Sequence, residues 1–326
     1  MSSREIGARQ ISAKAYLRRL GAFTGLILLC AGLAFATPVF LTVNNLLNVL
    51  RQVSVISLIG LGETFVILSG GIDLSVGSML GLTGIVTALT ARSGAGFATA
   101  ALTGVLAAGL MGLVNGLVHT LGRLPSFITT LGTMAVARGL AYVLSKGVPI
   151  SGFPGGFKVL GQGYFLGIPV PVIVVLIMAL ICSFVLTGTV FGRYVYAIGS
   201  NERAVKLTGI RVNLYKNLIF VASGLLTGVA ALIALGRLQS AHPTSGSGYE
   251  LNAIAAVVIG GASLSGGEGG PWGTILGALI MGVIENGLTL LNVNAFWQQV
   301  VIGSVIILAV LVDRLSRAER TDAIVK

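Results

Sequence analysis

The sequence predicts an all-α membrane protein, a polytopic bundle of about ten transmembrane helices. Of its 326 residues, 55% are hydrophobic and only 10% are charged, whereas a soluble domain carries about 25% charged residues. Apolar runs long enough to cross the hydrocarbon layer recur along the chain. The 47 glycines are typical of membrane helices that pack closely through small residues.

The apolar runs place the expected spans one after another. They cover residues 21–40, 53–71, 74–91, 97–118, 127–144, 172–190, 218–235, 251–264, 271–291 and 296–312. Residues 251–264 are short for a full span, so they are either a half-span or a buried, broken helix. Residues 42–52 contain three asparagines and an arginine and are expected to form an interfacial connection. Residues 146–171, rich in glycine and proline, are expected to form a long loop.

The distribution of basic residues predicts the orientation, because lysine and arginine concentrate on the cytoplasmic side. With the N-terminus inside, the cytoplasmic side collects Arg4, Arg9, Lys14, Arg18, Arg19, Arg123, Arg193, Arg203, Lys206, Arg211, Lys216, Arg314, Arg317, Arg320 and Lys326. The other side collects only Arg51, Arg92, Lys146, Lys158 and Arg237. We therefore expect both termini in the cytoplasm. Residues 1–20 and 313–326 would be cytoplasmic tails, and residues 21–312 the transmembrane domain, with a retained first helix rather than a cleaved signal.

The longest charged insertion between apolar runs spans residues 191–216. Within it, residues 201–207 are expected to form a short helix, since Ser200 and Asn201 are good N-cap residues and Glu202 suits a first turn. Gly209 is a natural stop for that helix. The segment is either a docking site for a partner or a solvated loop whose charges only set the orientation.

Several chemistries find no support in the sequence. There is no phosphate-binding Gly-x-x-x-x-Gly-Lys-Ser/Thr loop and no Gly-x-Ser-x-Gly nucleophile motif. His119 and His242 lie far apart, and Cys30 and Cys182 sit singly in apolar runs, so we expect no metal site, disulfide or cofactor. The net charge of +11 is scattered over loops and ends and forms no nucleic-acid surface. The sequence therefore gives no support for an enzymatic function.

Charged and amide side chains at membrane depth are the stronger signal. Glu63, Arg138 and Glu285 lie near the middle of apolar runs, where an unpaired charge costs at least roughly 2.5–3.5 kcal/mol. In one interpretation they border a polar translocation path together with Asn115 and Asn286. In the other, Glu63 or Glu285 pairs with Arg138 and fixes the packing of the helices.

Two glycine-rich turns resemble each other, which is typical of transporters built from repeats but is also compatible with a common turn sequence. Residues 70–77 read GGIDLSVG and residues 260–267 read GGASLSGG. Both are expected on the cytoplasmic side, with the polar residues Asp73, Ser75, Ser263, Ser265 and Glu268. Glycines spaced by four residues are expected to let helices approach closely. They occur at Gly77/Gly81, Gly112/Gly116, Gly224/Gly228 and Gly273/Gly277.

Six segments together resemble one family over about residues 37–313. They read FLTVNNLLNVLRQ, GETFVILSGGIDLSVGS, LPSFITTLGTMAVARG, GRYVYAIGSNERAVKLTGI, SGSGYELNAIAAVVIGGASLSGG and GTILGALIMGVIENGL. The family is that of the permease subunits of bacterial ATP-binding-cassette (ABC) importers for monosaccharides, of the ribose type. The segments are specific for the family and poorly specific for the sugar.

The resemblance implies a multi-pass protein of the bacterial inner membrane that works with partners. Two permease subunits, identical or paralogous, would form the pathway, a cytoplasmic ATPase, usually a fused tandem chain, would power it, and a periplasmic binding protein would deliver the sugar. It also implies a helix that couples the permease to the ATPase, and this favours docking for residues 191–216. The matching residues are Gly199, Asn201, Glu202, Ala204, Val205, Leu207, Gly209 and Ile210.

Two alternatives from other classes remain at this point. The chain could be a proton-coupled secondary transporter that uses Glu63 or Glu285 as a proton relay. It could also be a component of an exporter or channel, in which case it would not depend on an external binding protein.

Overall fold

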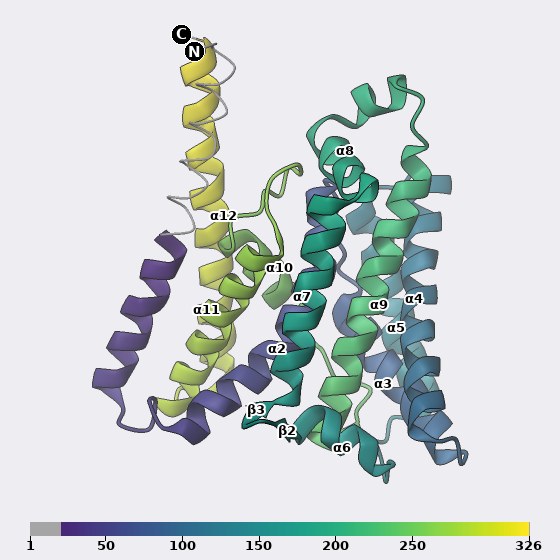
Figure 1. Cartoon of the computed structure of the whole chain (residues 1–326), viewed down its shortest axis with the longest axis vertical. Helices are drawn as coiled ribbons and strands as arrows, with labels where there is room; N and C mark the ends of the chain where they lie inside the picture. The colour runs from purple at the N-terminus through teal and green to yellow at the C-terminus, as the bar shows by residue number, and fades with distance from the viewer. Residues whose placement is uncertain (1–20, 326) are drawn as a thin grey trace.

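A computed structural model describes residues 21–325, which form a helical bundle with short strands of two residues each (Figure 1). The first helix of the described part covers Gly21–Ala36. The others are α2 (Val43–Leu68), α3 (Val76–Arg92), α4 (Phe97–Leu121), α5 (Ser126–Ser145), α6 (Gly155–Gln162), α7 (Val170–Gly188), α8 (Val190–Leu207), α9 (Val212–Leu238), α10 (Tyr249–Ile259), α11 (Pro271–Leu290) and α12 (Ala295–Val325). The predicted tail 1–20 lies outside the described residues, as do the side chains beyond Leu311 in the tail 313–326.

Every predicted span contains a helix, so the prediction of an all-α membrane protein is confirmed. Within the described residues, six helices are long and apolar enough to cross a membrane: α2, α4, α5, α7, α9 and α11. Four apolar helices are shorter, at Gly21–Ala36, in α3, in α10 and over Ala295–Leu311 of α12. The count of ten transmembrane helices stays a prediction.

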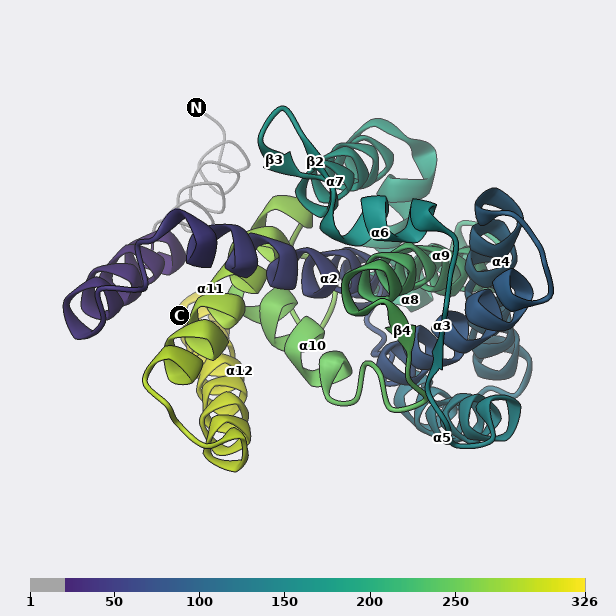
Figure 2. The ribbon, with the colours of Figure 1, turned by 90° about the horizontal axis from the view of Figure 1, so that it is seen from below.

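Helix α2 lies at the centre of the bundle. Seen from below, it runs between one group formed by α10, α11 and α12 and another formed by α3, α4, α5 and α9 (Figure 2). It packs on α7, α9, α10 and α11, and its residues from Val53 to Leu68 are all buried. The helix begins at Val43, where the Thr42 hydroxyl caps it by accepting the Asn45 N–H. The expected interfacial connection at 42–52 is therefore the first part of α2.

Glycines bring backbones together, as their spacing predicts. A Cβ placed on Gly112 of α4 would collide with the carbonyl oxygen of Phe220 on α9, and one on Gly224 would collide with that of Ala108. On α11, a Cβ at Gly277 would collide with the carbonyl of Ala256 on α10. Helices α4 and α9, and α10 and α11, therefore touch backbone to backbone, which only small residues permit.

Residues 146–171 are more ordered than the expected long loop. They contain α6 and three short strands: β1 (Ile150–Ser151), which pairs antiparallel with β4 (Ser240–Ala241), and β2 (Tyr164–Phe165), which pairs with β3 (Ile168–Pro169). Three of the eight residues of α6 are glycine, so its local helix propensity is weak. Packing determines it instead: Phe157 is fully buried, and a Cβ at Gly161 would collide with the backbone of α9 at Gly236.

Replacing Gly224 by leucine is expected to lower the free energy of unfolding by about 1–3 kcal/mol, because the side chain would have to occupy space held by the α4 backbone. The measurement is unfolding of the purified chain in detergent. Gly132→Leu on α5 is the matched control, since nothing lies within 4 Å of a Cβ at that position. Equal losses from both variants would contradict close packing of α4 on α9.

Candidate functional site

Helix α8 consists of two helices joined by a kink. Asn201 departs from helical geometry (φ −161°, ψ 88°), and its side-chain oxygen accepts the N–H of Ala204 at 3.0 Å. Asn201 therefore caps the short helix that follows, as its residue type predicts. The kinked segment lies at the end of the bundle toward which α12 runs, called here the α8 end (Figure 1). Helix α6 lies at the opposite end, called the α6 end.

The residues predicted to dock a partner divide into two sets. Asn201, Ala204, Leu207 and Gly209 are exposed, and Leu207 retains 90% of its accessible surface. The inward set is Gly199, Glu202 and Ile210, which are half-buried, and Val205, which is buried. Val205 packs with Ile198 and Val212. The short helix is thus anchored by one apolar face and presents the other to the outside.

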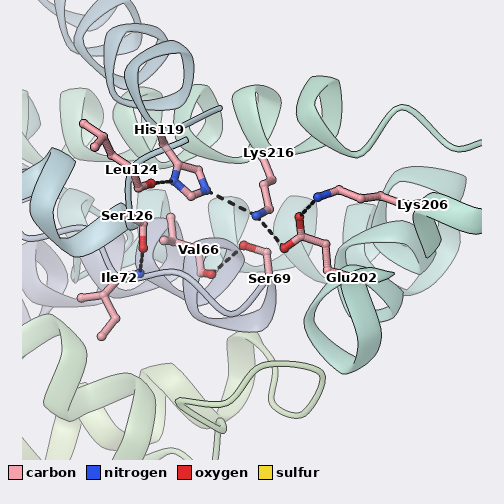
Figure 3. Close-up of polar contacts among 9 residues, drawn as sticks. All are labelled: Val66, Ser69, Ile72, His119, Leu124, Ser126, Glu202, Lys206 and Lys216. Carbon is pink, nitrogen blue, oxygen red and sulfur yellow. Dashed lines mark hydrogen bonds and ion pairs between the residues drawn. The ribbon is translucent and has the colours of Figure 1, made fainter. Parts of the chain in front are cut away.

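Glu202 joins the short helix to α9. Its carboxylate bonds the Lys206 ammonium at 2.6 Å and the Lys216 ammonium at 2.8 Å (Figure 3). Burial alone would raise the pKa of Glu202, but the hydrogen bonds and charges of the two lysines outweigh burial and lower the pKa below its ordinary value. The carboxylate is therefore ionised at neutral pH and ties the kinked segment to the start of α9.

The same contacts continue to α4. The Lys216 ammonium lies 3.4 Å from Nε2 of His119, and Nδ1 of His119 lies 2.6 Å from the carbonyl oxygen of Leu124 (Figure 3). Since a lysine ammonium only donates, the tautomer with the proton on Nδ1 satisfies both bonds. Cavities of about 270 Å³ and about 660 Å³ open beside these residues. The larger one is lined by Arg123, Lys206 and Lys216, with Glu202 as the opposing charge.

A buried polar network surrounds the turn between α2 and α3. The backbone N–H of Asp73 donates to the Glu63 carboxylate at 3.0 Å. The Asp73 carboxylate accepts the N–H and hydroxyl of Ser75, and the Asn115 amide donates to the Ser75 hydroxyl at 2.8 Å. Glu63, Asp73, Ser75 and Asn115 are all fully buried. The structure thus brings Glu63 and Asn115 together, and Asp73 and Ser75, predicted in a cytoplasmic turn, are buried.

Helix α5 supplies hydroxyl groups to the same turn. Ser126 accepts the N–H of Ile72 at 3.1 Å (Figure 3), and Thr130 accepts the N–H of Leu74 at 3.0 Å. One helical turn further along, Thr133 donates to the Asn115 amide oxygen. Ser126, Thr130 and Thr133 were not among the predicted site residues. The available signal was the spacing of Ser126, Thr130 and Thr133, which places three hydroxyls on one face of an apolar helix.

The other predicted path residues lie elsewhere. Arg138 donates to the carbonyl oxygens of Pro243 and Ser245 at 2.6 and 3.1 Å, and within the described residues it pairs with neither Glu63 nor Glu285. The interpretation in which Glu63 or Glu285 pairs with Arg138 is therefore wrong. Arg138 bonds the backbone instead, because the irregular segment before α10 has backbone carbonyls that need a hydrogen-bond donor inside the bundle.

Glu285 and Asn286 connect α11 to its neighbours. The two oxygens of Glu285 accept amide N–H groups from Gln52 of α2 and Asn252 of α10, each at 2.7 Å. Asn286 and Asn45 of α2 exchange two hydrogen bonds at 2.9 and 3.0 Å. None of the five predicted path residues lines either cavity beside α8. Their observed bonds join helices to one another or to the irregular segments before α3 and α10.

The second glycine-rich turn lies between α10 and α11 at the α8 end (Figure 1). Ser263 is fully buried, Glu268 is half-buried, and Ser265 is exposed. The N–H of Ser263 donates to the carbonyl of Glu268 at 2.8 Å and closes the turn. Among the side chains of residues 21–311, which the structure describes, no three His, Cys, Asp or Glu gather into a metal site.

Thr130→Val is expected to lower the free energy of unfolding by about 1–3 kcal/mol, because it keeps the side-chain shape and leaves the N–H of Leu74 without its acceptor. The control is Thr103→Val on α4, whose exposed hydroxyl bonds only the carbonyl of Thr99. Unfolding in detergent compares the two variants. A loss for Thr103→Val as large as that for Thr130→Val would contradict this role for α5.

Comparison with curated proteins gives relatives over nearly the whole chain. The ribose import permease protein of Bacillus subtilis (strain 168) is 47% identical over 312 residues, 95% of this chain and 97% of that protein. The ribose import permease protein of Escherichia coli (strain K12) is 44% identical over 321 residues, 96% and 99% of the two chains. The D-allose transport system permease protein of the same strain is 43% identical over 277 residues, 85% of each chain. No solved structure gives a significant match.

Residues 45–310 match the family described as the permease component of the branched-chain amino acid transport system. The match runs from α2 into α12 and includes the kinked α8 and both glycine-rich turns. With its six helices of membrane-spanning length in the described part, the chain is a multi-pass membrane protein and a transport component rather than an enzyme. This chain belongs to that family of transport-system permease components.

Proposed function

We propose that this chain is the membrane permease of an ATP-driven importer for a monosaccharide, ribose or a related sugar, in a bacterial inner membrane. The observation that carries the proposal is 43–47% identity, over most of the chain, to permeases named for ribose and D-allose. An L-arabinose ABC transporter permease of Azospirillum brasilense is 37% identical over 304 residues. The family description names amino acids, but the sugar permeases are the more specific guide because they match almost end to end.

The proposed topology has ten spans with both termini in the cytoplasm. Residues 1–20 and 313–326 are the cytoplasmic tails, and residues 21–312 are the transmembrane domain. The directions of the helices support this arrangement: α8 and the end of α12 lie at one end of the bundle, and α6 lies at the other (Figure 1). The basic residues of 191–216 thus lie at the α8 end, which the positive-inside rule assigns to the cytoplasm.

The kinked segment of α8 is the proposed contact with a cytoplasmic ATPase. Its exposed residues Asn201, Ala204, Leu207 and Gly209 would meet the ATPase, while Glu202, Val205 and Ile210 hold the segment against the bundle. The ATPase is proposed to be a fused tandem chain, the second permease an identical copy, and the supplier of sugar a periplasmic binding protein. ATP hydrolysis then belongs to the partner chain.

Glu63, Asn115, Arg138, Glu285 and Asn286 are proposed to border the translocation path. Their bonds to other helices and to irregular backbone support a bordering role, in which they keep interrupted helices in place beside the path. The carboxylate of Glu285 is bonded through both oxygens to amides, an arrangement that favours bracing over proton relay. The relatives named as ABC transporter permeases likewise favour ATP-driven import over a proton-coupled transporter.

Uptake of labelled ribose, allose and arabinose by vesicles that contain this chain, its ATPase and its binding protein tests the function. We expect uptake that requires ATP and the binding protein. Replacing residues 202–206 by a Gly-Ser segment should abolish that uptake while the chain still folds, because the coupling contact is lost. Full uptake by this variant would contradict the coupling role, and uptake driven by a pH gradient without ATP would contradict the importer.

Cysteine labelling in intact cells tests the orientation. Arg203 of α8 and Lys158 of α6 are both exposed and lie at opposite ends of the bundle. In a background with Cys30 and Cys182 replaced by serine, a membrane-impermeant maleimide should label Lys158→Cys and not Arg203→Cys. Labelling of Arg203→Cys from outside would contradict the proposed topology.

A further inference from the structure

Three glycine-bearing segments from distant parts of the chain meet at the α8 end. They are Gly70, just after the end of α2, Gly199, two residues before the kink of α8, and Gly266 and Gly267 in the α10–α11 turn. The N–H of Gly267 donates to the carbonyl oxygen of Leu68 at 2.9 Å. We call these four glycines the glycine junction. It joins both of the similar turns, 70–77 and 260–267, to α8.

No side chain separates the three backbones at this junction. A Cβ on Gly199 would collide with the carbonyl oxygen of Leu68 and lie 2.6 Å from the nitrogen of Gly267. A Cβ on Gly266 would lie 2.8 Å from the Cα of Gly199 and 3.0 Å from the nitrogen of Gly70. Gly266 also has φ 85°, a conformation that side chains other than glycine rarely adopt. The junction therefore requires glycine both for space and for backbone conformation.

A side-chain bond reinforces the same contact. The hydroxyl of Tyr196 on α8 donates to the carbonyl oxygen of Gly269 at 2.9 Å. Tyr196 precedes the kink at Asn201 by little more than one helical turn. The α10–α11 turn is thus attached to α8 by a hydrogen bond as well as by backbone packing.

We propose that the glycine junction transmits the movement of the kinked α8 segment to α2 and to the α10–α11 turn together. This inference rests on the proposed function and assigns Gly199 a positioning role toward the bundle, whereas the sequence predicts it among the ATPase contacts. Closely packed backbones leave no flexible side chain to absorb a displacement, so a shift of α8 moves both partners. The ATPase would bias two arrangements of the bundle through this contact.

The two segments that the junction joins to α8, the end of α2 and the α10–α11 turn, are each connected to a short helix. Five residues before Leu68, Glu63 of α2 accepts the N–H of Asp73 in the turn that begins α3. On the other side, α10 ends at Ile259 just before the second turn, and its Asn252 bonds Glu285 of α11. A displacement at the junction therefore has a path through these bonds and turns to both short helices, α3 and α10.

The test uses the complete transporter, with ATPase and binding protein, in lipid vesicles, and compares sugar uptake with ATP hydrolysis in the same sample. Tyr196→Phe removes the bond to Gly269 and keeps the ring. We expect it to lower the sugar transported per ATP by about 2- to 30-fold, the range found for residues that carry coupling. Gly199→Ala should lower the ratio further. Gly25→Ala, at a helical glycine with nothing within 4 Å of a Cβ, should leave the ratio unchanged.

Hydrogen exchange distinguishes transmission from static bracing. In the wild-type complex, ATP should change the exchange of residues 66–71 and 263–269, and Tyr196→Phe should reduce that change in both segments. If Gly199→Ala does not assemble, Tyr196→Phe decides alone. The proposed role of the glycine junction would be overturned if Tyr196→Phe transported as much sugar per ATP as the wild type. It would also be overturned if Tyr196→Phe lowered sugar uptake but left the ATP-dependent change in hydrogen exchange intact. Absence of ATP-dependent uptake by the wild type would instead overturn the proposed importer.

Discussion

The need to satisfy backbone polar groups inside an apolar bundle governs this structure. Hydrocarbon offers no hydrogen bonds, so a helix can be interrupted at depth only where the protein supplies the partners. At the turn before α3, the N–H groups of Ile72, Asp73 and Leu74 find Ser126, Glu63 and Thr130. Before α10, Arg138 donates hydrogen bonds to the backbone carbonyls of Pro243 and Ser245. Glu63, Ser126, Thr130 and Arg138 thus provide the hydrogen bonds that the interruptions before α3 and α10 require.

This requirement explains why a buried charge does not need an opposite charge beside it. A carboxylate that accepts N–H groups, or a guanidinium that donates to carbonyls, replaces its hydration with dipoles of the protein. Glu285, bonded by the amides of Gln52 and Asn252, is an example. The buried charges in this chain therefore organise backbone and helix contacts.

The sequence predicted the helical fold, a helix in each apolar run and the short helix after Asn201, because apolar runs, caps and glycine spacing are local signals. It also identified Glu63, Arg138 and Glu285 as unusual. It could not identify their partners, since Pro243 and Ser245 meet Arg138 through backbone carbonyls that any residue would provide. Helix α6 was missed for a related reason: its glycines weaken the local signal, and the backbone of α9 that stabilises it lies far along the chain.

The contact between α4 and α9 has a consequence for how this protein can change shape. Gly112 and Gly224 each face a carbonyl of the other helix, so the two backbones meet there without a side chain between them. Rotating α4 about its own axis would turn Met111 or Leu113, in place of Gly112, towards the facing peptide group. The pair must therefore travel as a single rigid body, and the rearrangement that opens and closes a passage has to take place at its borders.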